Sequence, residues 1–253
     1  LLLTLLWCLF LTYILWENLR SPSMLTGSNT YETILTLVKR MDDRPQDHVR
    51  AVFDLAAEFG LPVDMHVDES DRREDFTLPF VIEAARERRV PNVTVAHISS
   101  LSVQTDDVAR STIAALADAD VNVVVNPIIV KITRLSELLD AGVSVMFGSD
   151  NLRDPFYPLG AANPLGSAIF ACQIAALGTP QDLRRVFDAV TINAARMLGF
   201  PSLLGVVEGA VADLAVFPSA TPEEVVLDQQ SPLFVLKGGR VVAMRLAAGS
   251  RPE

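Results

Sequence analysis

The sequence predicts an α/β fold in which helices alternate with the strands of a parallel sheet. From Asp47 onward, stretches with apolar residues at helical spacing alternate with short apolar runs, which is the pattern of repeated βα units. Half of the 253 residues are apolar, enough for a sizeable core in one large domain or two modest ones. Shorter apolar runs and a glycine pair near the end of the chain predict a small β-module there.

Four βα units can be followed in order. The predicted strands are 61–66, 92–97, 121–126 and 143–147, and each is expected to be buried. The predicted helices are 48–59, 78–88, 106–117 and 132–139. Gly60 is placed to end the first of these helices. Four units are half of the eight that close a (β/α) barrel, so the pattern predicts a partial TIM-type barrel.

The chain changes character after Asp150. A loop containing Pro and Gly is followed by predicted helices at 165–177 and 180–198, of which the second is expected to break in the middle. Short strands are then predicted at 212–217, 233–237 and 241–245, with Gly238-Gly239 as a hairpin turn. We therefore divide the chain into a barrel part at 46–205 and a β-module at 206–253.

Residues 1–45 do not share the βα pattern. The run from Leu1 to Trp16 carries no charged residue. A spanning helix needs about 20 apolar residues, and no basic residues precede this run as they would in a signal sequence. We interpret 1–45 as a segment foreign to the body of the chain, with a short membrane segment as the alternative. Any membrane contact is expected only through 1–16, and the expected location is otherwise cytoplasmic.

Composition favours a small-molecule substrate. A net charge of −10 and a pI near 4.8 argue against nucleic-acid binding, which needs clustered Lys and Arg. Cys8 and Cys172 lie far apart without CxxC spacing, so neither a disulfide framework nor a thiolate zinc site is predicted. The sequence contains no GxSxG elbow, P-loop or dinucleotide-binding fingerprint.

Three ionisable residues lie at or just after the ends of predicted strands: His66, His97 and Asp150. In a parallel α/β fold these strand ends meet at one edge, where active sites lie. His and Asp are both good ligands for Zn²⁺ or Fe²⁺. One such residue alone is more typical of a hydrogen-bonded polar side chain, but three at successive strand ends predict a metal site.

Glu69 follows His66 by three residues, just beyond the predicted strand. From there a carboxylate can reach water at a metal without ligating the ion, as a general acid/base must. The alternative is that Glu69 is one solvated member of the charged loop at 68–74.

Five segments resemble the cytosine deaminase group of the amidohydrolase superfamily. They are LPVDMHVDES at 61–70, VAHISSLS at 95–102, VNPII at 125–129, FGSDNLRDPFYPLG at 147–160 and GAVADLAVF at 209–217. The resemblance covers about 45–242 and implies strands five to eight of a TIM-type barrel followed by a small β-sandwich remnant.

The resemblance also implies roles for the site residues. His66 and Asp150 would be metal ligands, with Asp150 also handling a proton; Glu69 would carry a proton to a ring nitrogen, and His97 would orient water or substrate. One divalent ion, Zn or Fe, is implied as the cofactor. The implied reaction is deamination of a cytosine-like pyrimidine or a related N-heterocycle, and a homo-oligomer is possible in such a family.

The chain departs from the family pattern in two ways. The His-x-His pair of the family's first strand is absent, and His48, at the start of a predicted helix, is expected to be solvated or to cap. We therefore expect an incomplete protein that is weakly active or inactive. Asn151 and Phe156 stand where cytosine deaminases have an acidic residue and a tryptophan, so these two substrate-pocket positions predict a different ring. Cyclic-amide hydrolysis and an inactive, membrane-tethered remnant remain as alternatives.

Overall fold

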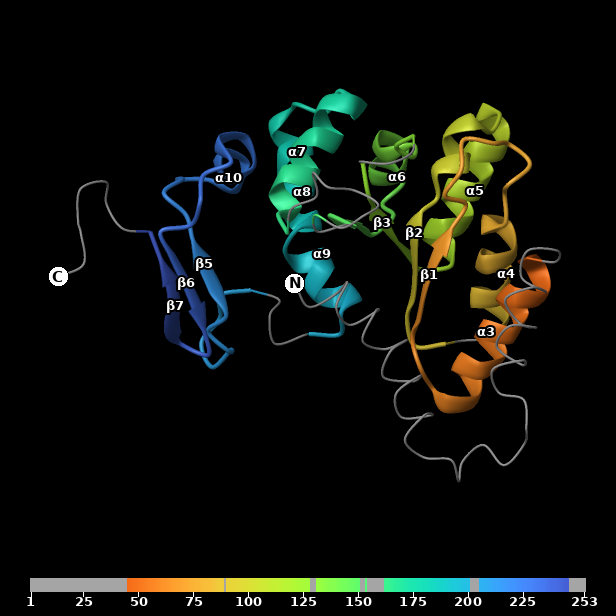
Figure 1. The fold of residues 1–253 in the computed structure, drawn as a ribbon, viewed down its shortest axis with the longest axis horizontal. Helices are drawn as coiled ribbons and strands as arrows, with labels where there is room; N and C mark the ends of the chain where they lie inside the picture. Colours follow the sequence, from red (N-terminus) through yellow and green to blue (C-terminus); the bar gives the residue numbers. More distant parts are fainter. Residues whose placement is uncertain are drawn as a thin grey trace.

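The structure is a computed structural model that describes residues 45–88, 90–127, 131–150, 153, 162–200 and 205–245. Figure 1 shows the elements along the chain. They are, in order, α3 (Pro45–Phe59), β1 (Val63–Val67), α4 (Leu78–Arg88), β2 (Val93–His97), the 3-10 helix η1 (Ser99–Val103), α5 (Asp106–Asp118), β3 (Val121–Val125), α6 (Leu135–Asp140), β4 (Val145–Phe147), α7 (Pro164–Ala175), α8 (Pro180–Ala189), α9 (Ile192–Met197), β5 (Leu214–Val216), α10 (Pro222–Asp228), β6 (Phe234–Lys237) and β7 (Arg240–Met244).

Strands β1 to β4 form one parallel sheet in the order β1-β2-β3-β4. Each strand is joined to the next through a helix, so the predicted α/β class with a parallel sheet is confirmed. Helix α3 packs on β1, α5 packs on β3, and α7, α8 and α9 pack on β4. The largest fully buried side chains come from both layers, with Phe53, Leu78 and Leu116 from the helices and Val95 and Val123 from the strands.

The strands of the parallel sheet differ in how far they are buried. In β1 the side chains alternate, with Val63, Met65 and Val67 buried and Asp64 and His66 exposed. All five residues of β2 are buried. The expectation that every predicted strand is buried is therefore wrong for β1, which is an edge strand of the sheet within the described residues.

The predicted helices and strands are found within a few residues of their expected bounds. The break in the second helix after Asp150 is confirmed, since α8 ends at Ala189 and α9 begins at Ile192. Helix α6 starts at Leu135, later than expected, because the backbone of Arg134 before it is not helical, with a ψ of 63°. Helix α10 was not predicted, although Thr221 accepts a hydrogen bond from the backbone N–H of Glu224 as an N-cap.

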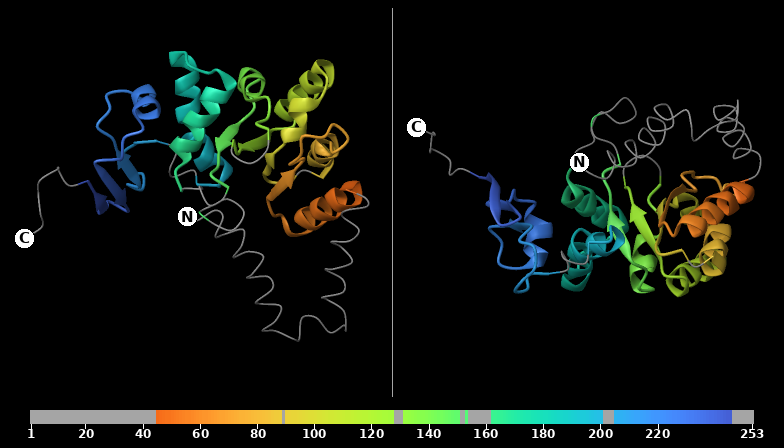
Figure 2. Two further views of the ribbon diagram at one scale, coloured as in Figure 1. Left: turned by 45° about the horizontal axis from the view of Figure 1, so that its top comes forward. Right: turned by 90° about the horizontal axis from the view of Figure 1, so that it is seen from below.

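The end of the chain forms a three-stranded antiparallel sheet, β5-β6-β7. Gly238 and Gly239 join β6 to β7 with φ of 56° and 76°, the left-handed conformation that a tight hairpin needs. Helices α7, α8 and α9 lie between this sheet and the parallel sheet (Figures 1 and 2). Helix α10 packs on α8 and α7 and buries Val226, which joins the module to the helical layer.

Within the described ranges, no helix is both long and apolar enough to cross a membrane. The apolar run at 1–16 lies outside those ranges.

Candidate metal site

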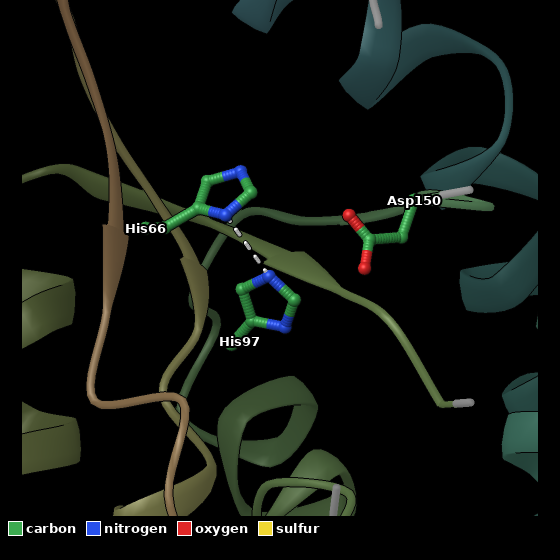
Figure 3. A group of neighbouring side chains, drawn as sticks. All are labelled: His66, His97 and Asp150. Carbon is green, nitrogen blue, oxygen red and sulfur yellow. Dashed lines mark hydrogen bonds between the residues drawn. The ribbon is translucent and has the colours of Figure 1, made fainter. Parts of the chain in front are cut away.

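His66 and His97 come together from neighbouring strands. The register pairs His97 with Val67, so a regular pleat would turn His97 to the buried side with Val67. Instead, His97 and Ile98 have φ of 69° and 43°, and this left-handed backbone redirects the chain at the end of β2. His97 Nε2 lies 3.2 Å from His66 Nδ1, and the two rings meet edge to face (Figure 3).

Asp150 approaches the histidine pair from the far edge strand of the same sheet, β4. It lies three residues beyond the end of β4, and its φ of 60° is again left-handed. Asp68, just after β1, has a φ of 54°. Left-handed backbone therefore occurs at the ends of three of the four parallel strands, at residues that are not glycine. Such conformations cost free energy and cluster at functional sites.

The three side chains fit one metal ion. His66, His97 and Asp150 each offer a ligand atom, and these atoms lie within 4.8 Å of one another (Figure 3). The 3.2 Å between His66 Nδ1 and His97 Nε2 is a hydrogen-bond distance, so the two rings are held together at this end of the sheet. Imidazole and carboxylate are also the donors that Zn²⁺ and Fe²⁺ accept.

Glu69 lies beside this group. Its Oε2 is 3.8 Å from His97 Nε2, and its side chain is 39% exposed, whereas that of His97 is 4% exposed. Burial lowers the pKa of His97, and the neighbouring carboxylates of Glu69 and Asp150 oppose that effect. Burial therefore favours a neutral imidazole, the form that can ligate a metal or accept a proton.

The sequence predicts no role for Asp68 other than membership of the charged loop at 68–74. Its carboxylate accepts hydrogen bonds from the backbone N–H groups of Thr77 and Leu78 and from the Thr77 hydroxyl. Burial raises the pKa of Asp68, and these hydrogen bonds oppose the rise. Asp68 thus closes the loop that carries Glu69 and caps the start of α4. A buried, hydrogen-bonded carboxylate cannot be told from its solvated neighbours by sequence alone.

The remaining predicted site residues have different outcomes. Asn151 and Phe156 lie outside the described residues. His48 lies in the first turn of α3, where it is half-buried, and its Nδ1 has no hydrogen-bond partner within the described part of the chain. The structure therefore shows no capping hydrogen bond from His48 Nδ1, and the solvated role expected for this half-exposed ring stays a prediction. His48 is also not a member of the group of potential metal ligands.

The family of the chain follows from a match that extends over most of its length. A family model described as "Amidohydrolase family" matches residues 23–243. The chain belongs to this family. The resemblance to amidohydrolases of the cytosine deaminase type is thereby confirmed.

Two similar curated proteins are named as a deaminase and an amidohydrolase. A pterin deaminase from Rhizobium rhizogenes is 34% identical over 203 residues, which are 74% of this chain and 46% of that protein. The N-isopropylammelide isopropyl amidohydrolase of Pseudomonas sp. is 35% identical over 106 residues, 42% of this chain and 26% of the relative. This amidohydrolase therefore spans about half, or less, of the length of these curated relatives.

A solved structure supports the fold. The 5-methylcytosine deaminase of Klebsiella pneumoniae, liganded with phosphonocytosine, superposes with a TM-score of 0.77 and 29% identity. The match covers 83% of this amidohydrolase and 55% of the Klebsiella chain.

Proposed function

We propose that this amidohydrolase is a metal-dependent hydrolase of non-peptide carbon–nitrogen bonds, which deaminates a cytosine-like pyrimidine or a related N-heterocycle. The observation that carries the proposal is the group of His66, His97 and Asp150 within 4.8 Å, with Glu69 beside it, at the carboxyl edge of a parallel sheet. That edge is where α/β enzymes perform their chemistry.

In this proposal His66 and Asp150 hold the ion, and His97 orients the attacking water or the substrate. A bound Zn²⁺ or Fe²⁺ would lower the pKa of water toward neutrality and so supply a nucleophile. The cluster contains three donors among the described residues, and the sequence has no His-x-His pair to add to them. We therefore propose that the chain binds the ion weakly and is weakly active at most.

Glu69 and Asp150 move the protons. Glu69 accepts a proton from the attacking water and donates it to the ring nitrogen next to the carbon under attack. Asp150 accepts the second water proton and returns it to the leaving amino group, so that water adds across the carbon–nitrogen bond and ammonia or an amine departs. The partial exposure of Glu69 lets its carboxylate approach a substrate while it remains 3.8 Å from His97.

The substrate class rests on the relatives together with two residues of the chain. The relatives are named for pterin, 5-methylcytosine and N-isopropylammelide. At Asn151 an amide both donates and accepts hydrogen bonds, whereas an ionised carboxylate only accepts. Phe156 is smaller than a tryptophan and leaves room for a bulkier ring or an N-alkyl group. We propose isocytosine-like or substituted pyrimidine and triazine substrates in preference to cytosine.

The fold proposal is that β1 to β4 correspond to strands five to eight of a TIM-type barrel, and that β5 to β7 belong to a β-sandwich. It is supported by the parallel order of β1 to β4 and by the superposition on the Klebsiella enzyme.

Metal titration tests the site. Zn²⁺ and Fe²⁺ should bind the chain with affinity weaker than nanomolar, measured by competition with a chromophoric chelator. The His66→Ala variant should lose most of this affinity, and the control His48→Ala should keep it, because His48 is not in the group. Sub-nanomolar affinity of the unaltered chain would contradict the proposed incomplete shell, and an unchanged His66→Ala variant would contradict the ligand assignment.

Competitive turnover tests the substrate. The metal-loaded protein is given cytosine together with isocytosine, a pterin and an N-alkylated triazine, and ammonia or amine release is assigned to each. A polar group left unpaired by the wrong ring costs roughly 1–3 kcal/mol, or about 10- to 100-fold in specificity. A clear preference for cytosine would show that Asn151 and Phe156 do not set specificity.

A further inference from the structure

We infer that Gln104 is a positioning residue that fixes the loop carrying Glu69 against the turn that follows His97. The inference rests on the proposed role of Glu69 and extends it to a residue that lies outside the metal-binding group. Gln104 directly follows η1, and only 8% of its surface is exposed.

The Gln104 side chain joins two loops at the carboxyl edge of the sheet. Its Nε2 donates to the backbone carbonyl of Arg73 at 3.0 Å and to that of Ser100 at 3.2 Å. Arg73 is four residues beyond Glu69, and Ser100 is three residues beyond His97. One amide group therefore sets the separation of two short backbone segments, each of which leads directly to a member of the Glu69–His97 pair.

Two further hydrogen bonds connect the same loops. Arg73 Nε donates to the carbonyl of Val103 at 3.0 Å, and the backbone N–H of Ser100 donates to the carbonyl of Asp68 at 3.1 Å. Arg134, from the loop after β3, donates to the carbonyl of Gln104 at 2.9 Å. The loops after β1, β2 and β3 are thus bonded to one another, and Gln104 is in contact with all three.

This arrangement has a functional reason. A general acid/base must be held within hydrogen-bond range of its proton partner, and a displacement of about 1 Å can cost two orders of magnitude in rate. Glu69 is on an exposed, charged loop that the Asp68 carboxylate anchors directly before it. Gln104 adds a second anchor on the other side of Glu69, at Arg73. The buried Gln104 amide anchors that loop from within.

The test replaces Gln104 by Met, which keeps the length of the side chain and removes its donor. Gln173→Met, on the exposed surface of α7, is the matched control. Amide hydrogen exchange should rise about tenfold at Ser70, Thr77 and Ser100, since the loss of two hydrogen bonds weakens local protection by about that factor. Exchange within β3 and β4 should not change. In the metal-loaded protein kcat should fall, with KM and metal affinity unchanged.

If Gln104→Met does not fold, Arg73→Met is used in its place. It removes the hydrogen bond from Arg73 Nε to the carbonyl of Val103 at an exposed position. Loop exchange that stays at its original rate in the foldable variants would overturn the inference, and so would exchange that rises equally in β3 and β4. If loop exchange rises while Glu69→Gln leaves turnover intact, the link between the loops stands and the proposed role of Glu69 fails.

Discussion

The polar side chains at the two ends of the parallel sheet differ in how completely they are hydrogen-bonded. At the amino end, Asn122 donates to Asn92 Oδ1 and to the carbonyl of Val93, while Asn92 donates to the carbonyl of Met197. At the carboxyl end, Asn126 Oδ1 and Thr133 Oγ1 are buried without hydrogen-bond partners in the described part of the chain. The left-handed residues that end β1, β2 and β4 lie at the carboxyl end as well.

This difference suggests that the amino end of the sheet mainly stabilises the fold, whereas the carboxyl end mainly serves the candidate site. Hydrogen-bonded buried amides join β2, β3 and α9 at the amino end, and such groups are costly to remove. Left-handed residues other than glycine are more frequent at the carboxyl end, although Asp120, directly before β3 at the amino end, also has a φ of 52°. Such backbone and unsatisfied polar atoms lower stability and persist mainly where they serve a site. Changes at the two ends should therefore affect different measured quantities.

The largest effect is expected from Glu69→Gln at the carboxyl end. A general acid/base contributes about 10² to 10⁴-fold to rate, so the weak turnover proposed for the metal-loaded protein should fall by that factor or to the uncatalysed background. Metal affinity and the free energy of unfolding should be unchanged, because Glu69 is partly exposed. Steady-state kinetics and metal titration measure the two outcomes.

The control for Glu69→Gln is Asp71→Asn, the same chemical change at an exposed position of the same loop. Turnover should be kept in that variant. Loss of metal from Glu69→Gln would reassign Glu69 as a ligand, and equal losses of turnover in the two variants would point to the charge of the loop rather than to one carboxylate.

A smaller effect, on stability alone, is expected from Asn122→Leu at the amino end. The substitution leaves the Asn92 and Val93 oxygens without their donor, which costs about 1–3 kcal/mol in the free energy of unfolding. Urea unfolding measures this, and metal affinity should not change. Asn163→Leu is the control, because Asn163 is exposed and makes no capping hydrogen bond with its side chain. A lower metal affinity in Asn122→Leu would show that the amino end of the sheet also affects the metal site.

Much of the sheet could be predicted from the sequence, since its signals are local. Apolar runs that alternate with helical periodicity identify β1 to β4, and the strand ends identify His66, His97 and Asp150 as neighbours at one edge. That these three side chains lie within 4.8 Å agrees with the expectation. Their roles as ligands and as proton carriers remain predictions.

The parts that escaped prediction depend on contacts between distant segments. Asp68 looks like any acid of a charged loop until its bonds to Thr77 and Leu78 are seen. Gln104 gains its position from carbonyls that belong to two loops. The exposed side chains of β1 were missed because a short apolar run with a polar residue at alternate positions was read as fully buried.

The smallest expected effect is the change in the free energy of unfolding caused by Asp182→Asn in α8. Its dependence on pH shows how much the charge of the carboxylate contributes to the hydrogen bonds there. Asp182 accepts hydrogen bonds from the hydroxyl and N–H of Thr179 and from Arg185, which lower its pKa from 3.8 to about 2. A depressed folded-state pKa adds stability above the unfolded value, and that stability is lost as pH falls from 3.8 toward 2.

Because Arg185 is partly exposed, solvent screening reduces the expected contribution to about 1 kcal/mol at pH 7. The free-energy difference between Asp182→Asn and the unaltered protein should shrink as the pH falls and vanish only below the folded-state pKa of about 2. The free-energy difference for Asn122→Leu, which involves no titrating group, should persist. Asp188→Asn in the same helix, whose pair with Arg184 is exposed, should have no measurable effect at any pH. If the free-energy difference caused by Asp182→Asn does not change with pH, the charge of the carboxylate contributes nothing to stability at the start of α8.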